Sequence, residues 1–309
     1  DKTMRNDVIN KITDLAGVDN RIILMVGDLG YNVVEEFKVN FPERFINVGI
    51  AEQNMNACAA GMALSGNVVF TYSIGSFPTL RCLEQIRNDC AYHNANVKIV
   101  CVGGGFTYGS LGMSHHATED IAVMRALPGV SVFCPADLVE AREVTKAIAG
   151  YNGTCYLRLG RGGEKRIHES IHDFKIGKAI KIGDGEKVAI FTTGAIAEEV
   201  VAAREILKKS GLTPALYTFP TVKPIDKDVI KECSEKFGLI VTVEEHNLDG
   251  GFGSAVAEVL CELPKGARLH RIGVPNAYAD TVGDQSYLRR YFGLDAESIA
   301  SVILKEMGE

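Results

Sequence analysis

Short apolar segments rich in β-branched residues alternate with longer amphipathic segments along the whole chain. This alternation is typical of parallel strands that are joined by crossover helices. It predicts strands at residues 21–26, 45–48, 68–72, 97–102, 130–134, 155–159, 188–193, 213–218, 239–244 and 268–273. It predicts helices at residues 7–17, 51–64, 79–92, 118–126, 137–149, 195–210, 226–236, 254–263 and 295–306. We therefore predict the α/β class, with mostly parallel sheets flanked by helices.

Two domains are expected, because 309 residues exceed what one hydrophobic core usually organises. A polar, turn-prone segment, residues 160–185, separates the two series of strands and ends in the Gly183-Asp184-Gly185 turn. We predict a first domain at residues 1–165, a linker at 166–185 and a second domain at 186–309.

The charge balance and the apolar runs disfavour several classes of protein. The 33 Lys and Arg residues stand against 39 Asp and Glu residues, a net charge of −6, which disfavours a nucleic-acid partner. No apolar run approaches the roughly 18 residues of a membrane span, and residues 1–7 lack the apolar run of a signal peptide. The eight cysteines stand singly without a CxxC pair, which favours reduced thiols over disulfides or a zinc site. We expect a cytoplasmic protein that binds neither nucleic acid nor membranes.

Two glycine-rich stretches are candidate ligand-binding loops. Residues 250–253 precede a predicted helix, but they lack the spacing of GxGxxG and P-loop motifs, which favours a tight turn over an anion site. Residues 103–105 follow a predicted strand and open a loop that reaches Thr118. Loops at this end of parallel strands commonly bind ligands.

The loop that follows residues 103–105 contains the only adjacent histidine pair, His115 and His116. A metal site is disfavoured, because neighbouring side chains diverge and no third spaced histidine accompanies them. The pair has two remaining interpretations, which are polar recognition or proton transfer in the loop, and hydrogen-bonded structural histidines.

Glu52 begins a predicted helix whose next residues, from Gln53 to Gly61, are mostly amides and small side chains. Such a helix surface lets a second backbone approach closely. A glutamate in the first turn of a helix is by itself explained by the helix dipole. The residues around Glu52 indicate a more specific role.

Residues 45–54, FINVGIAEQN, resemble a segment of the thiamine-diphosphate enzymes of the transketolase and deoxyxylulose-phosphate synthase group. In that group the segment carries the coenzyme-activating glutamate. Further segments resemble the family in the same order: 72–73, 83–87, 109–115, 119–125, 134–137, 242–246 and 250–254. The resemblance covers nearly the whole chain and implies a pyrimidine-binding domain followed by a transketolase C-terminal domain.

The resemblance implies two catalytic residues. Glu52 matches the glutamate that hydrogen-bonds N1′ of the coenzyme's aminopyrimidine, and His115 matches a histidine near the reacting oxygen of the substrate. Gly75 stands where the family usually has an aromatic residue that stacks on the pyrimidine, and Phe77 lies close by in the sequence. Phe77 is either that stacking residue, through a shifted loop, or an ordinary core phenylalanine. The residues expected to contact thiamine diphosphate are Glu52, Phe77, Asp28 and Ile50.

The resemblance also implies a set of substrate contacts, which are His115, His116, Arg161, Leu111 and Gly103. Leu111 stands where transketolases have an Asp that binds a hydroxyl, and Gly103 stands where some have a phosphate-contacting His. His116 replaces a common Gln, whereas Arg161 resembles a phosphate-contacting Arg of the family. These departures predict a modified or nucleotide-linked sugar in place of the standard pair of sugar phosphates.

The family's diphosphate-binding domain has no counterpart in this sequence. That domain holds a divalent metal through a Gly-Asp-Gly motif followed by an Asn, whereas residues 27–30 read Gly-Asp-Leu-Gly. The 183–185 triplet fits the motif, but no Asn occurs between Asn152 and Asn247. The resemblance therefore implies an N-terminal transketolase subunit that holds Mg²⁺ or Ca²⁺, an α2β2 assembly, and no metal ligand in this chain.

The implied activity is that of the C-terminal subunit of a split transketolase, a transferase that moves a two-carbon ketol unit from a ketose to an aldose. Its substrates would be sugars or sugar phosphates. Two other enzymes are alternatives, a deoxyxylulose-phosphate-synthase-like subunit and a β-type subunit of a 2-oxoacid dehydrogenase. A non-catalytic scaffold subunit is an alternative from another class, and the intact Glu52 segment argues against it.

Overall fold

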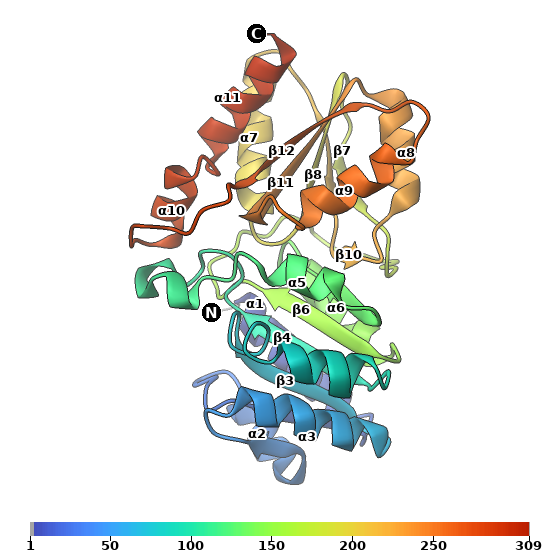
Figure 1. Cartoon of the computed structure of the whole chain (residues 1–309), viewed down its shortest axis with the longest axis vertical. Coiled ribbons are helices and arrows are strands. Elements are labelled where there is room, and N and C mark those ends of the chain that lie inside the picture. Colours follow the sequence, from blue (N-terminus) through green and yellow to red (C-terminus); the bar gives the residue numbers. More distant parts are fainter. Residues whose placement is uncertain (1–2, 309) are drawn as a thin grey trace.

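Two β-sheets organise the fold in the computed structural model, which describes residues 3–308 (Figure 1). The first sheet has the strand order β10-β5-β6-β4-β3-β1-β2, in which β10 runs antiparallel to β5 and the other pairs are parallel. Its strands are β1 (Ile22–Val26), β2 (Phe45–Asn47), β3 (Val68–Ile74), β4 (Val97–Val102), β5 (Val130–Phe133), β6 (Thr154–Leu159) and β10 (Thr221–Lys223).

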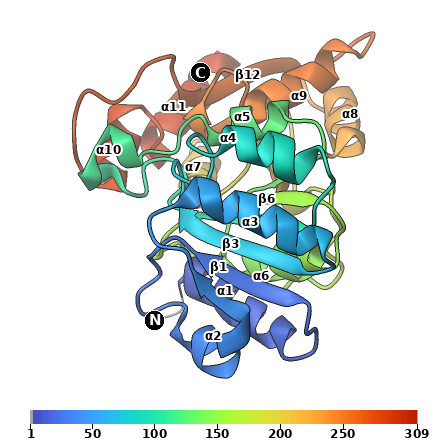
Figure 2. The same ribbon diagram turned by 60° about the horizontal axis from the view of Figure 1, so that its bottom comes forward.

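Helices cover both faces of the first sheet. The strands β4, β5 and β6 are therefore buried at every residue. The helices on one face are α1 (Met4–Ala16), α2 (Glu35–Asn40) and α6 (Leu138–Ala149). Those on the other face are α3 (Glu52–Leu64), α4 (Leu83–Gln85), which continues as a π-helical turn (Ile86–Ala91), and α5 (Asp120–Ala126). Figure 2 shows α3 and α4 side by side over the sheet. A 3-10 helix (Pro42–Arg44) precedes β2.

The second sheet has the strand order β12-β11-β8-β9-β7, with β7 antiparallel to β9. Its strands are β7 (Ile180–Gly183), β8 (Val188–Thr192), β9 (Ala215–Thr218), β11 (Leu239–Asn247) and β12 (Arg268–Val274). Its helices are α7 (Ala197–Lys209), α10 (Gln285–Tyr291) and α11 (Ala296–Met307) on one face, and α8 (Lys227–Lys236) and α9 (Phe252–Cys261) on the other. The apolar cluster beside α3 and α5 continues through Phe219 to α8 and α9, so the two domains share part of one core.

Each strand and helix that the alternating pattern predicted is present in the structure, and the predicted fold class is confirmed. The short elements α2, α10, β7 and β10 were not predicted, because three to seven residues are too few to show a period. β7 lies inside the expected linker 166–185 and pairs with β9, so the second sheet begins within that segment. β10 comes from the second half of the sequence but completes the edge of the first sheet.

The helix predicted at residues 79–92 begins later, at Leu83. Residues 75–82 form a turn in which the Thr79 hydroxyl donates to the Gly75 carbonyl over 2.7 Å. This hydrogen bond holds the chain in a compact turn ahead of the helix.

Two further observations concern the described residues as a whole. Within residues 3–308, no helix is both long enough and apolar enough to cross a membrane. All eight cysteines are free thiols; six of them are buried, whereas Cys58 and Cys261 are exposed.

Candidate functional site

The candidate site lies where the parallel strands β1, β3 and β4 end at the same edge of the first sheet. Asp28, Gly75 and Gly103 follow these three strands, and the Gly75 amide donates to Val102 at the end of β4 over 2.8 Å. Strand ends of this kind place loops from distant parts of the sequence next to one another.

Glu52 is the first residue of α3 and is 2% exposed. Because Glu52 begins the helix, its carboxylate lies at the positive end of the helix dipole, and no side chain caps this helix end. The backbone of Gly27 passes close by, since a Cβ added there would lie 3.5 Å from Glu52 Cγ. The described partner of the carboxylate is Arg81, whose Nη1 lies 3.0 Å from Glu52 Oε2.

Arg81 connects Glu52 to an aromatic group at the same strand edge. Its guanidinium lies over the Phe77 ring, 4.7 Å from the centroid. The Phe77 ring in turn meets the His115 ring edge to face, with 5.3 Å between centroids. The structure therefore brings the predicted residues Glu52, Phe77 and His115 together through Arg81.

Arg81 was missed by the sequence analysis. It lay inside the helix predicted at 79–92, where an arginine is ordinarily a solvated surface residue. The later helix start places it instead in the turn beside Phe77. No sequence signal marked the later start, because Pro78 precedes the predicted helix and is compatible with a helix that begins at Thr79.

A buried hydroxyl without a partner lies beside this group. Ser73, near the end of β3, has its Oγ buried and without a hydrogen-bond partner among the described residues. The same Cβ position on Gly27 that approaches Glu52 lies 3.6 Å from Ser73 Oγ. A buried carboxylate and an unpartnered hydroxyl that both lie close to Gly27 are hydrogen-bonding groups of the kind that the polar edge of an aminopyrimidine needs. These residues thus fit the pyrimidine half of thiamine diphosphate.

The loop of residues 103–118 presents His115 to this site. Gly105 and Ala117 pair as an antiparallel bridge and close the base of the loop. Beyond that base the chain forms two 3-10 turns (Gly109–Leu111 and Met113–His115). Ser76 Oγ donates to the Ser114 carbonyl over 3.2 Å, so the tip of the loop is attached to the turn that carries Phe77.

His116 lies inside the loop, next to His115 in the sequence but in a different environment. Its Nε2 is 3.4 Å from the Gly109 carbonyl oxygen, and its ring meets Phe106 edge to face. Burial lowers the pKa of His116, so the ring is neutral near pH 7. A substrate contact for His116 stays a prediction, and the contacts shown here hold the loop together.

The other predicted substrate residues lie in or beside the same loop. Gly103 has φ +95°, and a Cβ there would lie 2.3 Å from the Tyr108 ring, so packing alone explains this glycine. The guanidinium of Arg161 lies 5.2 Å from the centroid of the same Tyr108 ring, and Leu111 is 54% exposed. Their contacts with a sugar stay predictions.

Asp28 and Ile50 lie just beyond the ends of the strands β1 and β2. Asp28 is exposed and accepts a hydrogen bond from Asn47 Nδ2 over 3.0 Å. Asn47 Oδ1 accepts from the Asp28 and Gly49 amides, which fixes the two strand ends together. Ile50 is 79% exposed. Their contacts with the coenzyme stay predictions.

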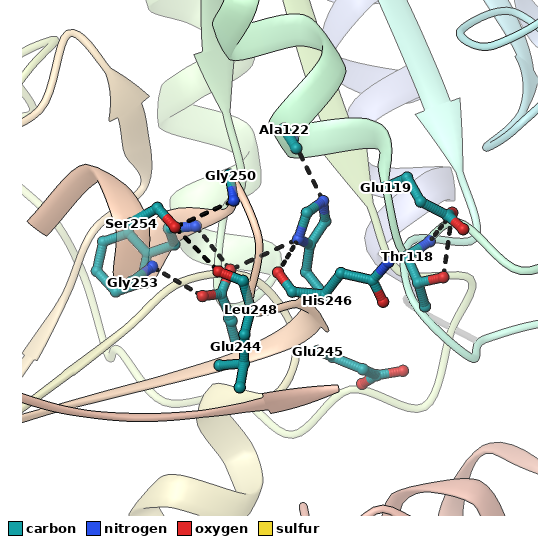
Figure 3. A network of polar contacts seen from close by, with 12 residues as sticks. Thr118, Glu119, Ala122, Glu244, Glu245, His246, Leu248, Gly250, Gly253 and Ser254 are labelled. Carbon is teal, nitrogen blue, oxygen red and sulfur yellow. Dashed lines mark hydrogen bonds and ion pairs between the residues drawn. The ribbon is translucent and has the colours of Figure 1, made fainter. Parts of the chain in front are cut away.

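The glycine-rich turn at 250–253 binds a carboxylate of the chain itself (Figure 3). Glu244 accepts from the Phe252 amide over 2.6 Å and from the Gly253 amide over 2.8 Å, at the start of α9. Burial raises the pKa of Glu244 to about 7. His246, whose pKa burial lowers to about 4, accepts from the Ala122 amide and so links β11 to α5. These contacts agree with the interpretation of a tight turn.

The described part of the chain contains no cluster of three or more His, Cys, Asp or Glu side chains placed to hold a metal ion.

Comparison with known proteins identifies the family. Residues 2–163 match the family model described as transketolase, pyrimidine binding domain, and residues 177–299 match transketolase, C-terminal domain. The chain belongs to the transketolase family. The family resemblance expected from the Glu52 segment is thereby confirmed.

Several family members resemble the chain along its length. It is 40% identical to a putative transketolase C-terminal section of Methanocaldococcus jannaschii, over 99% of this chain and 96% of the relative. It is 34% identical to one of the subunits of apulose-4-phosphate transketolase from Phocaeicola vulgatus, over 97% of this chain and 96% of the relative. It is 32% identical to 1-deoxy-D-xylulose-5-phosphate synthase of Caldanaerobacter subterraneus, but covers only 50% of that longer protein.

Solved transketolases share the fold. A split gene transketolase, described as an inactive β4 tetramer, superposes with a TM-score of 0.91 at 32% identity, over 99% of this chain and 98% of that chain. Transketolase from Campylobacter jejuni superposes with a TM-score of 0.83 at 19% identity, over 98% of this chain and 46% of that chain, and shows the fold alone.

Proposed function

We propose that this chain is the member of a two-chain transketolase that binds the pyrimidine half of thiamine diphosphate. Together with an N-terminal subunit, it transfers a two-carbon ketol unit from a ketose to an aldose. The observation that carries this proposal is the buried carboxylate of Glu52, which lies near the unpartnered hydroxyl of Ser73. Phe77 and His115 adjoin it through Arg81.

The relatives support a partner subunit. The chain covers 96% of a relative named a C-terminal section, but only 50% of the longer deoxyxylulose-phosphate synthase. We infer that the missing half is supplied by a separate N-terminal chain, which holds the diphosphate and Mg²⁺ or Ca²⁺ in an α2β2 assembly. The free thiols support a cytoplasmic location for the complex.

Thiamine diphosphate, when bound, supplies the carbon nucleophile that accepts the ketol unit. Glu52 would hold the aminopyrimidine and share a proton with its ring nitrogen, and Phe77 would pack against the ring. Arg81 is 48% exposed, and an ion pair that solvent reaches is weak, so its contact with Glu52 can be exchanged for the ligand. His115 would hydrogen-bond an oxygen of the sugar, and Arg161 would bind a phosphate or another anionic group.

The substrate is proposed to differ from the standard sugar phosphates. Leu111 offers no hydrogen bond at a position where transketolases bind a hydroxyl, and its side chain is exposed at the loop. Relatives that are named for apulose-4-phosphate and for 6-deoxy-6-sulfo-D-fructose support a modified sugar as the substrate class.

Reconstitution tests the proposal. This chain is produced with the transketolase-like N-terminal subunit of the same source, and ketol transfer is measured with thiamine diphosphate and Mg²⁺ across a panel of ketoses and aldoses. We expect activity from the complex and none from either chain alone. Decarboxylation of 2-oxoacids with no transfer of the remaining carbons to an aldose would identify a dehydrogenase-type subunit instead. Condensation of pyruvate with an aldose phosphate, with release of CO2, would identify a deoxyxylulose-phosphate-synthase type.

Substitution of Glu52 tests the catalytic residue. Glu52→Gln keeps the size of the side chain but removes its ability to share a proton, so we expect turnover of the complex to fall by about a hundredfold or more. Glu36→Gln is the matched control, because Glu36 is an exposed acidic residue in the first turn of α2. Full activity of the Glu52→Gln complex would support the scaffold alternative.

A further inference from the structure

The base of the 103–118 loop is attached to the second domain. Figures 1 and 2 show the green loop segment against α10, and the backbone of Gly109 is so close that a Cβ there would lie 2.6 Å from the Gly283 carbonyl oxygen. The Thr118 carbonyl accepts from the Asn247 amide over 2.8 Å, at the end of β11. The loop therefore leaves the first domain but rests on the second.

A buried carboxylate from the second domain lies at the centre of this attachment. Glu245, on β11, is 3% exposed, and its Oε1 accepts from the Phe106 amide over 2.6 Å. Gly105, with φ +62°, makes this approach possible, because a Cβ there would lie 2.5 Å from Glu245 Oε1. On the other side, Arg289 Nε donates to Glu245 Oε2 over 2.8 Å. The side-chain amide of Gln285, through Nε2, donates to both carboxylate oxygens of Glu245.

The charge of Glu245 is thus balanced from within its own domain. Arg289 is 2% exposed and also pairs with Glu198 of α7 over 2.6 Å. Gln285 reaches the Thr107 hydroxyl as well, over 3.3 Å, so α10 contacts the loop directly beside the Phe106 amide. A hydrogen bond from an amide to a buried, paired carboxylate is stronger and more directional than one to a neutral acceptor.

An aromatic stack extends the attachment towards the histidines. The Phe292 ring, just after α10, is stacked on Phe106 with 5.1 Å between centroids and 3° between planes. Phe106 also meets the edge of the His116 ring, with 5.2 Å between centroids. His116 follows His115 directly and precedes Ala117, which pairs with Gly105, so both of these contacts constrain the chain immediately after His115.

We propose that Glu245 is a positioning residue: the second domain sets the 103–118 loop through the Glu245–Phe106 hydrogen bond and the Phe292 stack, so that His115 faces Phe77. This assigns the second domain a part in sugar binding, although Glu52, Phe77 and His115 all belong to the first domain. The kinetic consequence rests on the proposed function, whereas the effect on the loop itself does not.

The experiment compares two variants with a matched control. Glu245→Gln keeps the shape but removes the charge that Phe106 and Arg289 bind, and Phe292→Leu removes the stacked ring at a half-buried position, where folding is least at risk. Thr218→Val is the control, because Thr218 is also buried and its hydroxyl hydrogen-bonds across the two domains to Glu140, which is not a residue of the loop.

Two readouts separate the loop from the chemistry. Hydrogen exchange of the amides of residues 106–116 is measured by mass spectrometry on the full chain, with and without the N-terminal subunit. Sugar KM, kcat and coenzyme affinity are measured on the complex. In both loop variants we expect exchange to become about tenfold faster and the sugar KM to rise about tenfold. Glu245→Gln replaces a hydrogen bond to a charged acceptor with a weaker one to a neutral acceptor, and Phe292→Leu removes one aromatic stack. We expect coenzyme affinity to stay within about twofold, since Glu52 and Phe77 are untouched.

The proposal is overturned if exchange in residues 106–116 is unchanged in both loop variants, or if Thr218→Val produces the same exchange and KM pattern. A complex that shows no ketol transfer at all would refute the proposed function, while faster exchange in the loop variants would still support the positioning role of Glu245.

Discussion

Phe77 is the residue whose environment most directly connects sequence and site. Its ring carries the guanidinium of Arg81 and meets the ring of His115, and it is only partly buried. An aromatic ring with accessible area beside a buried carboxylate is suited to stack on a planar ligand. Which aromatic residue would take this place could not be read from spacing alone, since Gly75 stands at the usual position.

Phe77→Ala is expected to weaken thiamine diphosphate binding by the complex about tenfold, the effect of one lost aromatic stack. Isothermal titration of the assembled complex with the coenzyme in Mg²⁺ measures this. Phe174→Ala is the control, because Phe174 is a partly buried aromatic residue packed on the opposite side of the first sheet. Equal affinities for the Phe77 variant and the wild type would reject the stacking role.

At the base of the 103–118 loop, Gly105 is required for two reasons: its positive φ and the close approach of the Glu245 side chain. Gly105→Ala is expected to cost about 3 kcal/mol of unfolding free energy, because strain at φ +62° is joined by a clash with Glu245. Gly211→Ala has a positive φ as well, +86°, but a Cβ there would meet nothing within 4 Å, so about 1 kcal/mol is expected there. Urea unfolding of the two variants measures the difference, and equal losses would show that Glu245 does not constrain Gly105.

The start of α6 shows how one carboxylate stabilises two elements. Asp137 Oδ1 accepts from the Val139 and Glu140 amides and caps the helix. Its Oδ2 accepts from the Ile167 and His168 amides, each over 2.8 Å, and so ties down the segment between the domains.

Asp137→Ala is therefore expected to lower the unfolding free energy by about 3 kcal/mol, since four backbone amides lose their acceptor. Asp295→Ala removes a cap from α11 that has no such second attachment, and about 1 kcal/mol is expected. Thermal or urea unfolding compares the two variants. A loss at Asp137 no larger than that at Asp295 would mean that the attachment of residues 167 and 168 adds nothing.

At the scale of the whole molecule, Glu140 joins the domains and makes their stability depend on pH. It is fully buried, accepts from the Ala136 amide over 2.6 Å and bonds to Thr218 of the second sheet. Burial raises its pKa to about 7 from an ordinary value of 4.5. The native state therefore keeps this proton in a range where the unfolded state has lost it, so the contribution of Glu140 is complete below pH 4.5 and is lost as the pH rises through about 7.

Glu140→Gln removes this titration. The unfolding free energy of the wild type minus that of the variant is expected to fall by about 2 kcal/mol between pH 5 and pH 8. Urea unfolding of both proteins at several pH values measures it. The difference reports Glu140 together with His168, because His168 Nε2 lies 3.5 Å from Glu140 Oε1 and the two groups titrate as a pair. Parallel stability curves would show that Glu140 is ionised in the native state across this range.

The sequence by itself determined the two-domain α/β organisation, the strands and helices of regular length, and the family to which the Glu52 segment points. These are local properties, because burial periodicity, helix caps and a ten-residue motif are contained in short stretches of chain. Only the tertiary structure decided that Arg81 joins Glu52 to Phe77, that β10 completes the sheet of the other domain, and that Glu245 holds the loop of His115. The Phe106–Glu245 contact joins residues 139 positions apart. Contacts of that kind depend on how whole sheets and helices pack, so no local sequence pattern predicts them.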